Sequence, residues 1–311
     1  MPDRAERPTD FAPRDRSAEL DSDRPCPFCP GNEESTPPAI EVIEADGTWS
    51  MRVIPNRYPA FEGDDAFTVQ NLGPVHVQAE ASGIHEVFVY TPDHYGGLHL
   101  LDDDHAAEMM RVLKRRLTEH AALGFVRYTQ VIFNHGREAG ASIAHPHGQI
   151  LGLPFVPSEV LDEEKAFARF AGGSLLETTL AAELAADERI VHANDDVVTY
   201  CPFASGVPYE MMIVPTEQEP HLQDASDASL AAVGIALRDS IAHLNALLGD
   251  VAFNVGIHTA PHQHGGEYHW HVHLWPQLTT QAGFERGTGV LINIVAPEDA
   301  ARELRSVGAG V

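Results

Sequence analysis

The chain has 311 residues, with 46 aspartates and glutamates against 20 lysines and arginines, and a formal net charge of −26. Hydrophobic residues make up 43% of it, enough for the core of one large domain or two ordinary ones, so wholesale disorder is excluded. The acidic excess argues against nonspecific binding to nucleic acid or anionic membranes, and no apolar run is long enough to predict a membrane span.

The chain begins with a charged, proline-containing segment. Residues 1–24 lack the apolar stretch of a signal peptide, and we expect them to form a flexible acidic arm. Three cysteines, Cys26, Cys29 and Cys201, do not make a disulfide scaffold, which favours a reducing, cytoplasmic location. Cys201 lies alone in an apolar run and is predicted to be a buried core thiol.

A CxxC motif, from Cys26 to Cys29, follows this arm. Two thiolates at this spacing can hold one face of a tetrahedral zinc ion. A redox pair of the thioredoxin type needs a strand before it and a helix after it, and the sequence Pro-Gly-Asn at 30–32 opposes the helix. Inert thiols are a third alternative. We favour zinc, and we expect histidines as the other ligands because the chain has no second cysteine pair.

One order of elements occurs twice in the chain. The shared elements are an apolar strand that begins with a glutamate, an amphipathic helix, a second strand and two histidines in an HxH pair. They lie at Glu86, 109–117, 128–134 and His145/His147 in the first copy, and at Glu210, 230–248, 251–256 and His271/His273 in the second. The distance from the glutamate to the last histidine is 61 residues in the first copy (86 to 147) and 63 in the second (210 to 273), which predicts an internal duplication.

The segment between the copies has a different composition. Residues 157–195 are rich in glutamate and alanine and predict a helical linker between an N-terminal half, 25–156, and a C-terminal half, 196–311. Strand-rich halves with a helix inserted between the strands predict an α+β fold.

The sequence His145-Pro146-His147-Gly148-Gln149 is the most specific motif. Side chains two residues apart in an extended segment share a face, which aligns the two histidines with the glutamine. The small-residue loop before it, 136–144, can bring backbone N–H groups to a phosphate. A neutral imidazole there can attack phosphorus, and a carboxamide can donate to a phosphate oxygen without supplying a proton for hydrolysis. The alternative is a pair of ordinary loop histidines.

A second histidine cluster covers residues 258–273. The same alternation places His269, His271 and His273 on one strand face and Trp270 and Val272 on the opposite, core face. Several converging histidines favour a metal whose ligand shell is completed by a carboxylate or water. The alternative is a polar, solvated strand face. We expect the neighbouring histidines to lie in an exposed loop; these are His262 and His264.

Taken together, HPHGQ, the upstream CxxC and the later HxH resemble the galactose-1-phosphate uridylyltransferase family, a branch of the histidine-triad superfamily, over about residues 25–305. The resemblance implies two fused histidine-triad-like halves, with an antiparallel sheet and flanking helices. It also implies a homodimer that acts on a nucleotide sugar and a sugar 1-phosphate. In that family a histidine takes UMP from UDP-glucose and passes it to galactose 1-phosphate.

The resemblance also assigns individual residues. It implies that His147 is the nucleophile and Gln149 its phosphate-stabilising partner. Substrate contacts are implied for Asn56, Asn134 and Ser142. The ligands implied for a structural zinc are Cys26, Cys29, His94 and His145. Those implied for a second metal, zinc or iron, are Glu163 (with Glu164 beside it as the other choice), His258, His271 and His273.

Part of the C-terminal half departs from the family pattern. Residues 283–293 do not match the hexose-binding segment of the best-known uridylyltransferases and look more like a shorter branch that includes plant ADP-glucose phosphorylase. Uridylyl transfer is our first prediction. The alternative is an adenylyltransferase that phosphorolyses ADP-glucose or a dinucleoside polyphosphate. A histidine-triad hydrolase would usually carry histidine in place of Gln149, and the intact HPHGQ argues against a non-catalytic metal-binding module.

Overall fold

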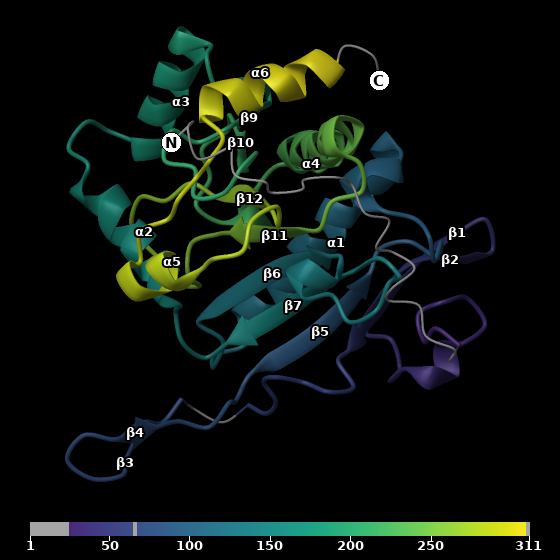
Figure 1. Ribbon diagram of the computed structural model, residues 1–311. Helices are drawn as coiled ribbons and strands as arrows, with labels where there is room; N and C mark the ends of the chain where they lie inside the picture. Colours follow the sequence, from purple (N-terminus) through teal and green to yellow (C-terminus); the bar gives the residue numbers. More distant parts are fainter. Residues whose placement is uncertain (1–24, 65–66, 309–311) are drawn as a thin grey trace.

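The computed structural model describes residues 25–64 and 67–308, so the arm predicted over 1–24 lies outside the described residues. Ten strands form one sheet whose pairs are all antiparallel (Figure 1). They are β1 (Glu41–Ala45), β2 (Thr48–Pro55), β5 (Ile84–Val89), β6 (Tyr128–His135), β7 (His147–Leu153), β8 (Ile190–Ala193), β9 (Val197–Tyr200), β10 (Met211–Pro215), β11 (Phe253–His258) and β12 (His271–Pro276). A separate hairpin, β3 (Gln70–Asn71) with β4 (Val77–Gln78), projects from the molecule (Figure 1).

Helices accompany this sheet, which confirms the predicted α+β class. In the described residues they are α1 (Asp103–Ala122), α2 (Ser158–Arg169), α3 (Leu175–Ala186), α4 (Asp227–Leu248), α5 (Gly283–Thr288) and α6 (Pro297–Gly308). None of them is long and apolar enough to cross a membrane. The interval 157–195 contains α2 and α3 and then β8, which pairs with β9 and ends the sheet at one edge.

The order of strands is symmetric about the middle of the sheet. It runs β1-β2-β5-β7-β6 in one half and β11-β12-β10-β9-β8 in the other, so that equivalent strands lie at equal distances from the β6–β11 boundary. At that boundary Asn134 of β6 is paired with Asn254 of β11. Strand β6 of the first half therefore shares a hydrogen-bonded edge with β11 of the second half.

The long helices of the two halves also correspond. Each begins after a side-chain cap, since Asp102 accepts the N–H of His105 before α1 and Ser226 accepts the N–H of Ser229 before α4. The two helices pack against each other; a Cβ at Gly234 of α4 would lie 2.5 Å from the carbonyl oxygen of Ala106, so only glycine permits this approach. One apolar core joins both halves, as buried residues of both belong to it, among them Phe88, Leu113, Leu237 and Trp270.

The structure corrects the register that we predicted for the duplication. His145 Nε2 and the carbonyl oxygen of Thr91 lie 2.9 Å apart across 54 residues, and so do His269 Nε2 and the carbonyl oxygen of Pro215. The pair equivalent to His145/His147 is therefore His269/His271, and our choice of His271/His273 was wrong by two residues. Three histidines at alternate positions offer two HxH pairs, and the spacing of the sequence alone did not distinguish them.

Candidate active site and metal-binding clusters

His147 opens β7 directly after a loop of small residues. Two glycines of this loop have a left-handed backbone, Gly136 at φ 82° and Gly140 at φ 87°. At Gly136 a Cβ would also lie 2.7 Å from Cβ of Ala252, so the turn requires glycine. Ser142 lies exposed on the same loop. The chain thus brings a small-residue segment next to the start of the histidine strand.

The imidazole of His147 is held in one orientation. Its Nδ1–H donates to the carbonyl oxygen of His145, at 2.9 Å, which leaves the lone pair on Nε2. Burial lowers the pKa of His147 below its usual 6.5, although the carbonyl contact opposes this. The ring is therefore neutral at pH 7, the form in which imidazole is a nucleophile.

Gln149 lies two residues further along β7. Its Oε1 is 2.7 Å from Nε2 of His85, a residue of β5 that our reading of the sequence did not single out. The only hint was a histidine near the start of a strand that is apolar apart from His85 and Glu86. The structure therefore joins Gln149 to a partner 64 residues away in the sequence.

The two asparagines predicted to contact substrate, Asn56 and Asn134, lie at strand ends. Asn56 follows β2, and its Nδ2 is 3.1 Å from Nε2 of His85. Asn134, near the end of β6, accepts a 2.7 Å hydrogen bond through Oδ1 from Nδ2 of Asn254. The same Nδ2 donates to the carbonyl oxygen of Ala139 in the loop, at 2.8 Å. Asn254 belongs to the second half and was also missed, since no motif contains it.

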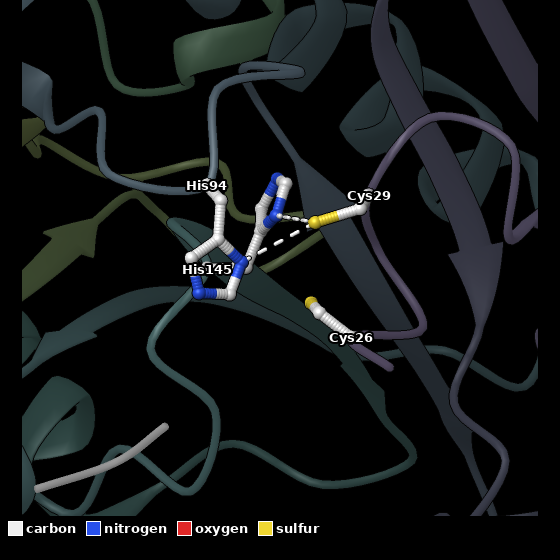
Figure 2. A group of neighbouring side chains, drawn as sticks. All are labelled: Cys26, Cys29, His94 and His145. Atoms are coloured by element: carbon white, nitrogen blue, oxygen red, sulfur yellow. Dashed lines mark hydrogen bonds between the residues drawn. The ribbon is translucent and has the colours of Figure 1, made fainter. Parts of the chain in front are cut away.

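Two cysteines and two histidines come together near the start of β7 (Figure 2). One ligand atom from each lies within 4.8 Å of the others; they belong to Cys26, Cys29, His94 and His145. Cys29 Sγ lies 3.3 Å from His94 Nδ1 and 3.6 Å from His145 Nδ1. The four residues implied by the resemblance therefore form one cluster that can hold a metal ion.

The ring of His145 is arranged as a metal ligand usually is. Its Nε2–H donates to the carbonyl oxygen of Thr91 at 2.9 Å, which fixes the ring and leaves Nδ1 as the lone-pair atom facing the cysteines. Burial lowers the pKa of His145 to about 4, so the ring stays neutral at pH 7. Two thiols and two imidazole lone pairs at this separation fit a tetrahedral ion.

A second group of potential ligands lies in the other half. Its ligand atoms also lie within 4.8 Å of one another and belong to Glu163, His258, His271 and His273. Glu163 Oε1 is 2.7 Å from His258 Nδ1, and His271 is only 3% exposed. The alternative of a solvated strand face is therefore not what the structure shows. Glu164 instead pairs with His264, at 2.6 Å.

His262 differs from our expectation of an exposed loop residue. It is 4% exposed, and its Nε2 lies 2.9 Å from Oγ1 of Thr129 in β6. The loop after β11 folds back onto the first half, and sequence pattern could not show this contact between distant segments.

Residues 1–157, half of the chain, match the family described as galactose-1-phosphate uridyl transferase, N-terminal domain. The chain belongs to the galactose-1-phosphate uridylyltransferase family. Residues 96–306 also match a family described as a domain of unknown function, DUF4921. The resemblance predicted from HPHGQ and CxxC is confirmed, and so is the nucleotidyltransferase class, since the relatives are uridylyltransferases and an ADP-glucose phosphorylase.

Relatives of both predicted kinds are found. The ADP-glucose phosphorylase of Arabidopsis thaliana is 32% identical over 98% of this chain and 88% of its own length. The galactose-1-phosphate uridylyltransferase of Thermotoga maritima is 28% identical over 90% of this chain and 88% of its own. A crystal structure of the Arabidopsis phosphorylase with bound ADP-glucose superposes with a TM-score of 0.82 at 29% identity, over 99% of this chain and 94% of that chain.

Proposed function

We propose that this member of the family transfers a nucleoside monophosphate from a nucleoside diphosphate sugar to a second phosphate-bearing acceptor, through a covalent intermediate on His147. The observation that supports this most is the orientation of that ring, because its Nδ1 is occupied by the carbonyl oxygen of His145 and Nε2 keeps the lone pair. The lowered pKa keeps the nucleophile neutral at pH 7.

Two displacements at phosphorus complete the proposed cycle. In the first, His147 Nε2 attacks the α-phosphorus, a P–N bond forms, and the bond from that phosphorus to the bridging oxygen breaks, so sugar 1-phosphate leaves with the electron pair. In the second, a phosphate oxygen of the acceptor attacks, the P–N bond breaks, and the lone pair returns to Nε2. The NH2 group of Gln149 stabilises charge on a non-bridging oxygen during both displacements.

The remaining polar residues bind the substrate in this proposal. Ser142, exposed on the small-residue loop, contacts phosphate, while Asn56 and Asn134 contact the nucleotide part. Oδ1 of Asn134 already accepts a hydrogen bond from Asn254, so the NH2 group of Asn134 is the part available to a ligand. Asn254 lines a cavity of about 870 Å³, together with Glu138, Trp275, Gln277 and Arg286 among others.

UDP-glucose and a hexose 1-phosphate are the first proposed substrates, and the relative from Thermotoga maritima is named a galactose-1-phosphate uridylyltransferase. ADP-glucose with inorganic phosphate as acceptor is the second candidate. It is favoured by the 32% identity to the Arabidopsis phosphorylase over nearly the whole chain. Both candidates use the same nucleophile and differ in the base and the acceptor.

Intact-protein mass measurement after mixing with UDP-glucose or ADP-glucose, without acceptor, tests the proposal. We expect a mass increase equal to UMP or AMP, with release of one equivalent of glucose 1-phosphate, and the adduct names the base. The adduct should disappear when the acceptor is added. Multiple turnovers without any adduct would contradict a covalent intermediate, and an adduct mapped to another residue would contradict the role of His147.

We also propose that the first cluster holds a structural zinc ion, because two thiolates and two imidazoles are a preferred zinc ligand set. Bound zinc would tie the CxxC turn to the segment that precedes His147. The ligands would be Cys26, Cys29, His94 and His145. The second cluster, with three imidazoles and one carboxylate, suits zinc or iron.

Elemental analysis of two variants tests both metal proposals. We expect Cys26→Ser to remove one zinc equivalent and lower the melting temperature, and Glu163→Gln to lower the content of the second metal alone. Wild-type protein that contains no metal after purification in metal-supplemented medium would contradict both sites.

A homodimer in the cytoplasm is the remaining part of the proposal, expected from the family resemblance and from the cysteine content. Sedimentation equilibrium should give twice the chain mass, and a monomer at micromolar concentration would contradict the dimer.

A further inference from the structure

His85 contacts two residues of the proposed active site, Gln149 and Asn56, and one backbone N–H group. It belongs to β5, is half-buried, and its Nε2 lies 2.7 Å from Oε1 of Gln149. Its Nδ1 accepts a 3.0 Å hydrogen bond from the backbone N–H of Ala60, in the segment that follows β2. The Nδ2 atom of Asn56 lies 3.1 Å from Nε2. One imidazole thus joins two strands and the loop that carries a proposed substrate contact.

The contacts with Ala60 and Gln149 determine which ring nitrogen carries the proton, and the NH2 group of Asn56, itself a donor, does not also donate to that nitrogen. A backbone N–H can only donate, so Nδ1 of His85 must offer its lone pair to Ala60. The neutral ring then carries its hydrogen on Nε2, and this N–H donates to Oε1 of Gln149. With its oxygen engaged, Gln149 has only its NH2 group left for a ligand.

We propose that His85 is a positioning residue, which fixes the carboxamide of Gln149 so that its NH2 group faces the phosphate bound at His147. This inference rests on the function proposed for those two residues. The two ends of a carboxamide have nearly the same shape and opposite hydrogen-bonding character. If Gln149 turned over, its carbonyl oxygen would face a phosphate oxygen, and a stabilising donor would be replaced by a repelling acceptor.

The other half of the sheet does not contain this pair. The position equivalent to His85 is Tyr209, whose hydroxyl donates to Oε2 of Glu303 at 2.6 Å. The position equivalent to Gln149 is His273, a member of the second metal cluster. The positions of the second half that are equivalent to His85 and Gln149 therefore hold no histidine–glutamine pair, as expected if the pair serves the proposed nucleophile.

Two substitutions separate the hydrogen bonds of His85. In His85→Asn, Oδ1 can still accept the N–H of Ala60, but the donor to Gln149 is lost. In His85→Gln, an amide N–H can reach the place of Nε2, so the donor to Gln149 is kept. We expect His85→Asn to slow formation of the nucleotidyl adduct about ten- to hundredfold at saturating donor, and His85→Gln to recover a large part of that loss.

A double-mutant cycle with Gln149→Ala gives the decisive measurement. In that background the donor has nothing to orient, so His85→Asn should change the adduct rate by less than about threefold. The matched control is His192→Asn, the same replacement at an exposed position of β8, which should leave the rate unchanged. Melting temperatures of all variants report whether each has folded.

The outcomes distinguish this inference from the function on which it rests. An equal loss from His85→Asn with and without Gln149→Ala, or no loss in the wild-type background, overturns the positioning role while the enzyme remains active. The same holds if His85→Gln is as slow as His85→Asn. Wild-type protein that forms no adduct with UDP-glucose or ADP-glucose overturns the proposed function instead.

Discussion

The two halves of the sheet repeat one framework but place different chemistry on it. Equivalent residues differ in number by 124, as in the pairs 86 and 210, 91 and 215, 145 and 269, and 147 and 271. His145 belongs to the cysteine cluster, whereas its counterpart His269 bonds to Pro215 and takes no part in the second cluster. A duplicated backbone therefore conserves the hydrogen bonds of a histidine without conserving its role.

The proposed nucleophile illustrates the same difference. His147 and His271 each bond through Nδ1 to the carbonyl oxygen two residues earlier, at 2.9 Å. Nε2 of His271, however, lies 3.0 Å from Nε2 of His273 and belongs to a cluster that could hold a metal ion. At the position of His273 the first half has Gln149, which does not compete for the lone pair of His147. The residue at this position is therefore one of the differences between a group of potential metal ligands and a proposed catalytic site.

The largest expected effect is on nucleotidyl transfer, which should be lost when His147 is replaced but not when His271 is replaced. His147→Ala should lower nucleotidyl transfer at least about a thousandfold, because the group that forms the covalent bond is lost, while the melting temperature stays near that of the wild type. His271→Ala should leave adduct formation measurable and reduce the content of the second metal. Adduct mass and metal content of both variants, measured side by side, check this; an adduct in His147→Ala would assign the nucleophile elsewhere.

Buried charge gives a second contrast between the halves. Arg116 of α1 donates to both carboxylate oxygens of Glu86, at 2.6 and 3.0 Å, and both residues are under 5% exposed. The equivalent position in α4 is Ser240, which donates to the carbonyl oxygen of Ala236 at 2.6 Å. The first half therefore contains a buried ion pair that the second half lacks.

Breaking the Arg116–Glu86 ion pair should lower stability more than removing the hydrogen bond of Ser240. Arg116→Met leaves the Glu86 carboxylate buried without its cation and should lower the free energy of unfolding by about 3–5 kcal/mol. Ser240→Ala removes one neutral hydrogen bond and should cost about 1 kcal/mol or less. Urea titrations of both variants measure the difference, and equal losses would mean that the ion pair contributes no more than an ordinary contact.

The two equivalent glutamates should respond to pH in opposite directions. Burial tends to raise the pKa of Glu86, but hydrogen bonds from His120 and Arg116 outweigh it and bring the pKa below 4.5. Its ionisation therefore stabilises the fold above pH 4.5, and this contribution is lost as the pH falls through the lowered value. Burial raises the pKa of Glu210 above 4.5, although N–H groups of Gly206 and Val207 oppose the shift. Ionisation of Glu210 therefore destabilises the fold as the pH rises.

The smallest predicted effect is the change with pH in the stability of variants at Glu86 and Glu210. The stability lost in Glu86→Gln should be greatest near pH 7 and shrink below about pH 4.5. Relative to the wild type, Glu210→Gln should gain stability as the pH rises from 4 to 7, by about 1.4 kcal/mol for each pH unit that separates the folded and unfolded pKa values of Glu210. Unfolding free energies at several pH values test both, and parallel slopes would contradict the assigned environments.

Local patterns in the sequence predicted much of the molecule. Alternating apolar residues and helical spacing placed the long helices and the central strands, because burial of one face imposes that period. HPHGQ and CxxC were recognised because their chemistry depends on short fixed spacings. The resemblance supplied His94 and His145 as partners of the cysteines, and the structure brings these four together.

Contacts across the sheet were decided by the tertiary structure alone. His85 meets Gln149 across 64 residues, and Asn254 meets Asn134 across 120. Neither pair shares a motif, and each depends on the strand register, which places Asn254 directly opposite Asn134 and His85 diagonally across from Gln149. The register of the duplication was also visible only in the structure. So was the preference for Glu163 over Glu164 as a potential metal ligand. A sequence carries the period of each strand, but the partner of each residue is set only when the strands pair and bury one common core.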